Sequence, residues 1–381
     1  MKVLYILKHD PWGIGGGCYA SRCYFEAFET IFANAQFDVL CCSEFYDNIL
    51  AHISKQFSVK AVPPMSKWTK LSSVATKVIN RFHQHALNLI KRNSYDWCVF
   101  DHSSIAGSIS KYCKDRGVRT IVINHNCEYD YYRDSHPQWY KTFATLPIIK
   151  WNENNAFLYC DFNIFLTQED YRQFELMYGS SQTSAIVSGC FLHRDYSEKE
   201  PLIIGQHTNP KLVISGTIGN VQNMDGITHF LNHLYQYVPK NVEIVITGKN
   251  PPSSLIERIS GFPNVNIVPN PKDINEVIST CDIFLCPTRL GGGMKLRIMD
   301  GLLAGLPVIT HRVSARGYSS FVEKGFMEIY ETEEQFQRAL QRMLNNLSER
   351  RLKRYDIQAF ARNEFSFEQK VRLLSDYIES F

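Results

Sequence analysis

Residues 287–310 read PTRLGGGMKLRIMDGLLAGLPVIT, and this stretch decides the fold. The apolar run Ile283–Cys286 just before it predicts a buried strand. Three glycines follow, and then a helical pattern that begins near Met294 and ends at Gly305, a residue type that often caps helix C-termini. Residues 307–310 begin the next apolar strand. A strand, a glycine-rich loop, a helix and another strand indicate a parallel α/β sheet with a ligand site at its edge.

Three charged residues in this stretch indicate a site for a nucleoside diphosphate. Lys295 and Arg297 are expected in the first helical turn, where cations oppose the helix dipole unless an anion binds there. Asp300 follows in the same expected helix, and its carboxylate is suited to accept a hydrogen bond from a ribose hydroxyl. The alternative is that these charges form a solvated face of the helix. A solvated face would not require the three glycines that precede it. The loop residues expected to line the donor site are Gly291, Gly292, Gly293 and Met294.

Length and composition set the class of protein. The chain has 381 residues, of which 44% are hydrophobic and 21% charged, and its formal net charge is +3. At roughly 150 residues per domain, this length favours two domains. The apolar content excludes a disordered chain. So small a positive excess is no global signature of nucleic-acid binding, so we expect no nucleic-acid partner.

Targeting and metal-binding signals are absent from the sequence. The N-terminal apolar run of six residues is too short for a signal peptide. No apolar run approaches the ~20 residues that span a bilayer. The 11 cysteines are odd in number and lack the spacing of metal ligands, so reduced, buried thiols are expected. These observations predict a cytoplasmic protein without structural zinc.

Strand-like and helix-like segments alternate along the whole chain, with a polar break at 197–210. The strands expected before the break are 2–7, 37–42, 97–100, 120–124 and 162–166. Those expected after it are 211–215, 243–247, 265–268, 283–286 and 307–310. We therefore expect two successive parallel-sheet domains that face a central cleft. Their expected bounds are 1–196 and 210–363, followed by an amphipathic final helix at 364–381.

The stretch at 287–310 resembles the donor-binding signature of family-4 glycosyltransferases, which have the GT-B fold. The matching residues are Gly291, Gly293, Lys295, Arg297, Ala304, Gly305, Pro307, Val308 and Ile309. Asp300 stands where that family usually has a glutamate that binds the ribose. Residues 215–218, 223–226, 125–129, 153–178 and the terminal helix also resemble family segments, so the resemblance covers nearly the whole chain and is weakest over 43–95.

This resemblance implies an α/β GT-B fold of two Rossmann-like parallel-sheet domains, with the terminal helix crossing back to the first domain. It implies transfer of a sugar, with retention, from a UDP-, GDP- or dTDP-linked donor to a saccharide or lipid-linked acceptor. Capsule, O-antigen or other surface-polysaccharide synthesis is the expected context. Gly216 and Thr217 are implied in donor binding, and His125, Lys295 and Arg297 in catalysis. No cofactor is expected, and no metal, since the chain contains no Asp-x-Asp pair.

Two departures from the family pattern bear on the sugar. The position of the first carboxylate of the family's Glu-x7-Glu pair is occupied by Gly292. The loop 217–226, where many relatives carry an Arg and a Lys, contains neither. The positive charge at the diphosphate is therefore expected from Lys295 and Arg297.

The N-terminal half offers further candidates at strand ends, where open α/β sheets bind ligands. His125 follows the strand at 120–124 and, by the resemblance, faces the transferred sugar; a capping or core histidine is the alternative. His102 follows the strand at 97–100, and Asp101 beside it is a candidate to orient it. Further cleft-lining or acceptor candidates are Glu128 and the loop residues Gly15, Gly16 and Gly17, for which a flexible turn is the alternative.

No acidic residue occurs from Asn48 to Tyr95, although eight Lys and Arg lie there. An apolar stripe at helical spacing accompanies them, which predicts a basic amphipathic helix within 55–92. We expect this segment to contact an anionic membrane surface and hold the protein peripherally on the inner face of the cytoplasmic membrane. A core-facing helix with a solvated basic back is the alternative.

Three function classes remain open at this stage. The first is the glycosyltransferase described above. The second is a nucleotide-sugar epimerase of similar two-lobed fold, for which Glu128 is the evident acid/base candidate. The third is a non-catalytic nucleotide-sugar-binding protein, because the first family carboxylate is missing.

Overall fold

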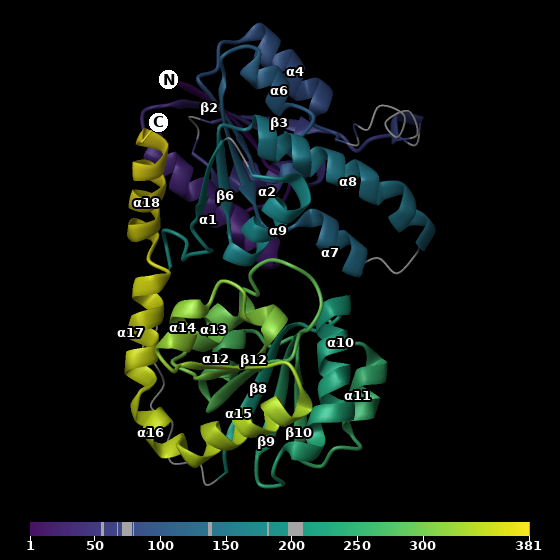
Figure 1. Cartoon of the computed structure of the whole chain (residues 1–381), viewed down its shortest axis with the longest axis vertical. Helices are drawn as coiled ribbons and strands as arrows, with labels where there is room; N and C mark the ends of the chain where they lie inside the picture. Colours follow the sequence, from purple (N-terminus) through teal and green to yellow (C-terminus); the bar gives the residue numbers. More distant parts are fainter. Residues whose placement is uncertain are drawn as a thin grey trace. The chain divides into compact units, whose positions relative to one another are not determined.

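The computed structural model describes residues 1–54, 57–66, 68–70, 78, 80–135, 139–180, 183–196 and 209–380. The chain divides into two compact units (Figure 1). The N-terminal unit comprises Met1–Tyr196 and Ser366–Phe381, and the C-terminal unit comprises Ser197–Phe365. Most of the polar break expected at 197–210 lies outside the described residues.

The N-terminal unit is built on a seven-stranded sheet in the order β3-β2-β1-β4-β5-β6-β7, with every neighbouring pair parallel. The order reverses between β1 and β4, which is where doubly wound sheets bind ligands. The strands are β1 (Lys2–Ile6), β2 (Gln36–Cys42), β3 (Ser58–Val62), β4 (Trp97–Phe100), β5 (Arg119–Asn124), β6 (Phe162–Phe165) and β7 (Ser184–Val187).

Helices connect these strands, and the last helix of the chain joins the same unit. Figure 1 shows α18 (Phe367–Glu379) alongside α1 (Gly16–Ile31). Tyr377 of α18 packs edge-on against Phe162 of the sheet, with ring centroids 5.4 Å apart. The other α-helices are α2 (Tyr46–His52), α4 (His83–Arg92), α5 (Ser103–Ala106), α6 (Ser110–Lys114), α7 (Glu128–Ser135), α8 (Trp139–Tyr159) and α9 (Gln168–Tyr178).

The C-terminal unit has a six-stranded sheet in the order β10-β9-β8-β11-β12-β13, again parallel throughout, with its reversal between β8 and β11. Its strands are β8 (Lys211–Thr217), β9 (Glu243–Lys249), β10 (Val265–Pro269), β11 (Ile283–Cys286), β12 (Val308–His311) and β13 (Met327–Tyr330). Its α-helices are α10 (Val221–His229), α11 (Ser253–Ile259), α12 (Ile274–Ser279), α13 (Arg297–Leu303), α14 (Ser319–Glu323), α15 (Glu333–Asn345), α16 (Leu347–Leu352) and α17 (Arg354–Glu364).

The prediction of two Rossmann-like parallel sheets is confirmed, but three strands were not predicted. These are β3, β7 and β13, and all three lie at the edge of a sheet. Edge strands are only partly covered, and the residues of β3 and β7 are mostly half-buried or exposed. They therefore lack the continuous apolar run that marks a central parallel strand.

The helix of the 287–310 stretch begins later than the sequence predicted. The expectation was a start near Met294, whereas α13 begins at Arg297 and leaves Lys295 in the preceding loop. Gly291 and Gly293 adopt φ of 83° and 69°, which a right-handed helix cannot include. The loop therefore continues past the glycines before the first helical turn forms.

Among the described residues, no helix is both long enough and apolar enough to cross a membrane.

Candidate functional site

A small pocket lies at the carboxyl end of β8, beside the sheet reversal of the C-terminal unit. It has a free volume of about 10 Å³. Gly216 lines it with a φ of 141°, a backbone conformation that residues with a side chain rarely adopt. A Cβ on Gly216 would lie 3.3 Å from both Arg297 Nη1 and Asn223 Nδ2. The glycine therefore allows two polar side chains to approach the strand end closely. The lining residues are Ile214, Ser215, Gly216, Ile218, Asn223, Ile227, Pro287, Thr288 and Arg297.

Arg297, the first residue of α13, is held by neutral oxygens. Its Nη1 donates to Asn223 Oδ1 and, over 3.3 Å, to Thr288 Oγ1. Asn223 in turn donates from Nδ2 to the carbonyl of Thr217 over 2.7 Å. This chain of hydrogen bonds joins the end of β8, α10, the strand end at β11 and the start of α13. The guanidinium is thereby fixed at a helix start, where its charge and the N–H groups suit an anion.

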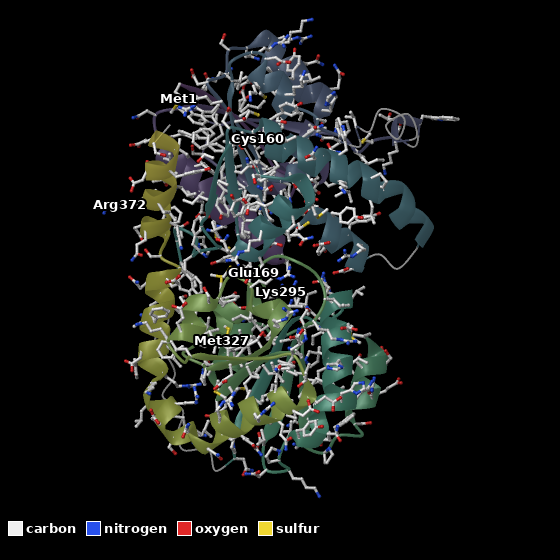
Figure 2. The ribbon with its side chains drawn as sticks, in the orientation of Figure 1. Met1, Cys160, Glu169, Lys295, Met327 and Arg372 are labelled. Atoms are coloured by element: carbon white, nitrogen blue, oxygen red, sulfur yellow. The ribbon has the colours of Figure 1, made fainter. Side chains whose placement is uncertain are left out.

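Lys295, which Figure 2 labels, is 6% exposed and lies against the glycine loop. Its Nζ donates to the carbonyl of Gly292 over 2.9 Å and to Gln222 Oε1 over 3.3 Å. Gln222 also lies against Gly291, since a Cβ there would come within 2.3 Å of Gln222 Nε2. Lys295, Gln222 and the loop therefore form one packed unit, with Met294 buried next to them.

Asp300 follows Arg297 by one turn of α13 and is half-buried. Burial raises the pKa of its carboxyl to about 7, and the charge of Arg297 opposes that rise. Within the described parts of the chain, its carboxylate forms no ion pair. A ligand that donates hydroxyl hydrogen bonds would stabilise the charged form of Asp300.

The N-terminal unit holds a buried cluster at the carboxyl ends of β1, β4 and β5. Asp101 is completely buried, and its Oδ1 accepts a hydrogen bond of 2.9 Å from His125 Nε2. Its Oδ2 accepts from Ser21 Oγ over 2.7 Å and from the backbone N–H of Lys8 over 3.3 Å. Burial alone would raise the pKa of Asp101, but His125 and the neighbouring histidines outweigh it and lower the pKa to about 2. Asp101 is therefore charged over the physiological range.

His102 lies face to face with His125, with centroids 4.1 Å apart and planes inclined by 14°. Its Nδ1 lies 3.1 Å from Glu128 Oε1, and Lys8 Nζ lies 3.3 Å from Glu128 Oε2. Burial lowers the pKa of His102 well below its ordinary value, and Lys8 lowers it further. Burial likewise lowers the pKa of His9, which packs edge-on against His102, to about 4.

One sequence-based assignment in this cluster is wrong. Asp101 was expected to orient its neighbour His102, but it bonds to His125, and Glu128 takes His102 instead. Successive residues in extended backbone point to opposite sides, so adjacent side chains such as these rarely meet.

Three buried carboxylates hold the segment 125–129, and two of them were not predicted. Glu153 accepts from the backbone N–H groups of Glu128 over 2.7 Å and Tyr129 over 3.1 Å at the start of α7. Asp170 accepts from the N–H of Cys127 over 3.4 Å. The third carboxylate is that of Asp101. Burial, and to a smaller extent the charge of Glu128, raise the pKa of Glu153 to about 8.

The glycine loop of the N-terminal unit leads into α1. Gly15 is the residue before the helix and adopts φ of 127°, while Gly16 and Gly17 form the first turn. All three are exposed, and a Cβ on Gly17 would lie 3.4 Å from the His9 ring. One turn further, Ser21 reaches Asp101, so α1 joins the loop to the histidine cluster.

Among the described residues, Asp101, His102 and His125 form the group whose geometry could hold a metal ion, with ligand atoms within 4.8 Å of one another. The hydrogen bond between Asp101 and His125 uses one of these atoms from each residue. The arrangement present is a carboxylate–imidazole pair.

The basic stretch is only partly described. Lys55, Lys67, Lys77 and much of the apolar stripe at 71–79 lie outside the described residues. Trp68 is 82% exposed and Lys70 is exposed. Further along, α4 buries Ala86 and Ile90 in the core, as the core-facing alternative requires.

Comparison with known proteins relates the C-terminal unit to one family. Residues 209–346 match the model of the family described as glycosyl transferases group 1. This match contains the pocket at β8, the glycine loop and the whole of α13. No curated protein matches the chain.

Solved structures similar to this one include a sucrose-phosphate synthase from Thermosynechococcus elongatus, with a TM-score of 0.72 and 12% identity over 100% of this chain and 98% of that one. Anabaena Alr3699/HepE in complex with UDP has a TM-score of 0.69 and 15% identity over 100% of both chains. The lipopolysaccharide outer core galactosyltransferase WaaB has a TM-score of 0.69 and 14% identity over 100% of this chain and 99% of that one.

The chain has the GT-B fold. In this GT-B chain the predicted donor residues gather as two groups: Gly216, Thr217 and Arg297 around Asn223, and the glycine loop with Lys295 around Gln222. Asn223, Gln222 and Thr288 were not singled out, because uncharged polar side chains at a helix start or strand end carry no distinctive pattern. The resemblance of residues 223–226 to a family segment was the one available signal.

Proposed function

We propose that this protein transfers a sugar from a nucleotide-sugar donor to a saccharide or lipid-linked acceptor, as a metal-independent, retaining enzyme of glycosyltransferase family 4. The observation that carries the proposal is the placement of Arg297. Its guanidinium is fixed by Asn223 and Thr288 at the start of α13, inside the segment that matches the glycosyltransferase family.

The reaction needs the charges found there. Breaking the bond between the sugar and the diphosphate develops negative charge on the leaving phosphate. Arg297 and Lys295 supply fixed positive charge at that point, and the glycine loop supplies backbone N–H groups. Asp300 is assigned to the ribose, whose hydroxyls donate to a carboxylate. The Anabaena structures in complex with UDP and with UDP-glucose support a nucleotide sugar as the donor.

We assign the acceptor to a surface polysaccharide such as capsule or O-antigen, and place the enzyme in the cytoplasm, peripherally on the membrane. Two structures of the same fold, WaaG and WaaB, are described as acting in lipopolysaccharide biosynthesis or on its outer core. The exposed Trp68 beside Lys70 supports a membrane contact, since tryptophan favours the interface and lysine the anionic headgroups.

Sugar transfer is tested with labelled UDP-, GDP- and dTDP-sugars. The release of the nucleotide and the incorporation of the label into the acceptor are measured separately. We expect both signals from the wild-type protein and a 10- to 100-fold loss in Arg297→Ala, since a charge-assisted hydrogen bond contributes about 1.5–3 kcal/mol. Arg342→Ala is the matched control. Arg342 of α15 forms an ion pair with Glu328 of β13 and does not line the pocket at β8. Conversion of the donor sugar without transfer would indicate an epimerase, and binding without any reaction a non-catalytic protein.

A further inference from the structure

A hollow on the C-terminal unit has a free volume of about 440 Å³ and shares no lining residue with the pocket at β8. It is lined by residues of β13 and α15 and by Arg312, which directly follows β12. Ligand sites in proteins have volumes of roughly 300–1,000 Å³, so the hollow is large enough for a ligand. Three of its lining residues are arginines and one is a glutamate, so its lining carries a net positive charge.

The hollow follows the free edge of a sheet. β13 is the last strand of the six-stranded sheet and pairs with β12, where Thr310 lies opposite Ile329. The N–H of Val308 on β12 donates to the carbonyl of Phe326 over 3.0 Å, so the even-numbered residues of this segment bond to β12. The backbone groups of alternate residues in a strand face opposite edges. The N–H and C=O of Ile329 therefore face the open edge.

Residues from both faces of β13 line the hollow. Tyr330 packs against Phe336 of α15, with ring centroids 5.2 Å apart, so α15 covers the face of β13 on which Tyr330 lies. Successive side chains of a strand point to opposite faces, so Ile329, which is 38% exposed, lies on the other face. Because both residues line the hollow, it extends around the edge of the strand.

The three arginines of the hollow differ in how their charges are compensated. Arg342 donates two hydrogen bonds, of 3.1 and 2.7 Å, to the carboxylate of Glu328. Arg312 pairs over 3.1 Å with the glutamate that lines the hollow. Arg338 is exposed and forms no ion pair with a described carboxylate, while its Nε donates to the carbonyl of Glu334 over 3.3 Å. The charge of Arg338 is therefore available to a ligand in the hollow.

We propose that this hollow binds an extended peptide segment of a partner protein, which adds a strand to the edge of β13 and carries acidic side chains at alternate positions. An unpaired strand edge can take up a further strand through backbone hydrogen bonds. Every second side chain of the added strand lies on the α15 face, where Arg338 favours Asp or Glu. The others lie on the face of Ile329, where apolar side chains fit. The proposal does not rest on the proposed function, because different residues line the two sites.

The test is fluorescence anisotropy of a labelled peptide of about eight residues that alternates valine and glutamate, titrated with the full chain. We expect saturable binding. The same peptide with an N-methyl group on every amide keeps its charge and side chains but cannot donate backbone hydrogen bonds, so its affinity should be lower by about tenfold or more. A peptide that alternates valine and lysine should not bind, because its charges would repel Arg338.

Ile329→Pro tests the strand edge in the protein itself. The N–H that it removes faces the open edge and is not used by β12, and proline is tolerated at edge positions of this kind. We expect the variant to keep the wild-type circular dichroism spectrum and to lose about tenfold in peptide affinity. Ile329→Ala keeps the N–H and is the matched control, so it should lose less affinity than Ile329→Pro.

Arg338→Gln tests the recognition of acidic side chains. It should weaken binding of the valine–glutamate peptide about three- to fivefold, as expected for an exposed ion pair. Lys240→Gln, which removes an exposed charge elsewhere in the same unit, is its control and should bind as the wild type does.

The peptide comparisons decide the question even where Ile329→Pro does not fold. No saturable binding of the valine–glutamate peptide would overturn the proposal and would mean that the charges around β13 only protect its edge. Equal binding of the N-methylated peptide would also overturn it, since that result indicates attraction to charge without strand pairing. Equal binding by Arg338→Gln and the wild type would place the peptide at another surface.

Discussion

The two polar clusters of this molecule compensate their charges in different ways. In the C-terminal unit, Arg297 rests on the neutral oxygens of Asn223 and Thr288. In the N-terminal unit, the carboxylates of Asp101 and Glu128 face histidines and Lys8, and the polar atoms left over are uncharged. The first arrangement keeps a positive charge in place for an anion, and the second offers hydrogen bonds to a neutral hydroxyl group. Under the proposed function, the first cluster is the one suited to the phosphates of the donor.

The largest effect we expect is on the stability of the N-terminal cluster. Glu153→Ala leaves the backbone N–H groups of the half-buried Glu128 and Tyr129, and the hydroxyl of Tyr178, without their acceptor, which should lower the free energy of unfolding by about 2–4 kcal/mol. Urea unfolding measures the change. Glu169→Ala, an exposed carboxylate in the first turn of α9, is the control and should cost less than about 1 kcal/mol.

The raised pKa of Glu153 predicts that the free energy of unfolding depends on pH. Because burial raises the pKa of Glu153 to about 8 from an ordinary value of 4.5, the folded protein holds a proton that the unfolded chain has released. The free energy of unfolding therefore falls as pH rises, by about 1 kcal/mol between pH 7.0 and 8.5. Glu153→Gln should reduce this slope. An identical slope in both proteins would show that Glu153 is already ionised at pH 7.

In the C-terminal cluster, the corresponding test is Asn223→Ala. Asn223 orients Arg297 by accepting from its guanidinium, so its loss should lower kcat/KM for the donor by about tenfold or more. Measuring the effect on kcat and on KM separately shows whether the orientation matters for binding or for the transition state. Wild-type kinetics in this variant would mean that Arg297 does not need Asn223 for its role.

A smaller effect is expected at Asp300, because a ribose contact is the same in the ground and transition states. Asp300→Ala should raise the donor KM about tenfold and leave kcat nearly unchanged. The wild-type KM should also fall as pH rises through about 7, where the carboxyl ionises, and Asp300→Asn should remove that dependence. A collapse of kcat with an unchanged KM would instead make Asp300 a catalytic group.

The smallest effect we expect is on binding to membrane vesicles. It compares the exposed basic residues of the N-terminal unit with those of the C-terminal unit. The full chain should pellet with phosphatidylglycerol vesicles in a salt-dependent way through its N-terminal unit, since each basic residue near the surface contributes about 1 kcal/mol. Replacing exposed Trp68, Lys60 and Lys70 by Ser, Gln and Gln should weaken pelleting several-fold. The control replaces two exposed lysines of the C-terminal unit, Lys240 and Lys249, by Gln. Equal pelleting with neutral vesicles would refute an electrostatic contact.

Whether a feature could be predicted from the sequence depends on whether it is formed by contiguous residues with a distinctive pattern. The central strands and the donor stretch are contiguous, so apolar runs and the glycine loop at 291–293 identify them directly. Edge strands such as β3 were missed because their half-exposed residues resemble a loop. The start of α13 was misplaced because positive φ at Gly293 is not visible in a helical pattern.

The histidine cluster was only partly accessible in the same way. His125, His102 and Asp101 were selected because each follows a strand, but their partners come from elements more than 20 residues away. Glu153 caps α7 from α8, and Ser21 reaches Asp101 from α1. Such contacts depend on how the sheet is ordered, and no local spacing in the sequence encodes them.

The central claim is that the C-terminal unit binds the diphosphate of a nucleotide sugar at Arg297. It is tested most directly by thermal unfolding in the presence of UDP-, GDP- and dTDP-sugars, since a ligand of the native state raises Tm with its concentration. We predict that donors carrying one of these bases raise the Tm of the wild type and of Arg342→Ala, and that Arg297→Ala loses most of the shift. No shift with any donor, or a full shift in Arg297→Ala, would contradict the account.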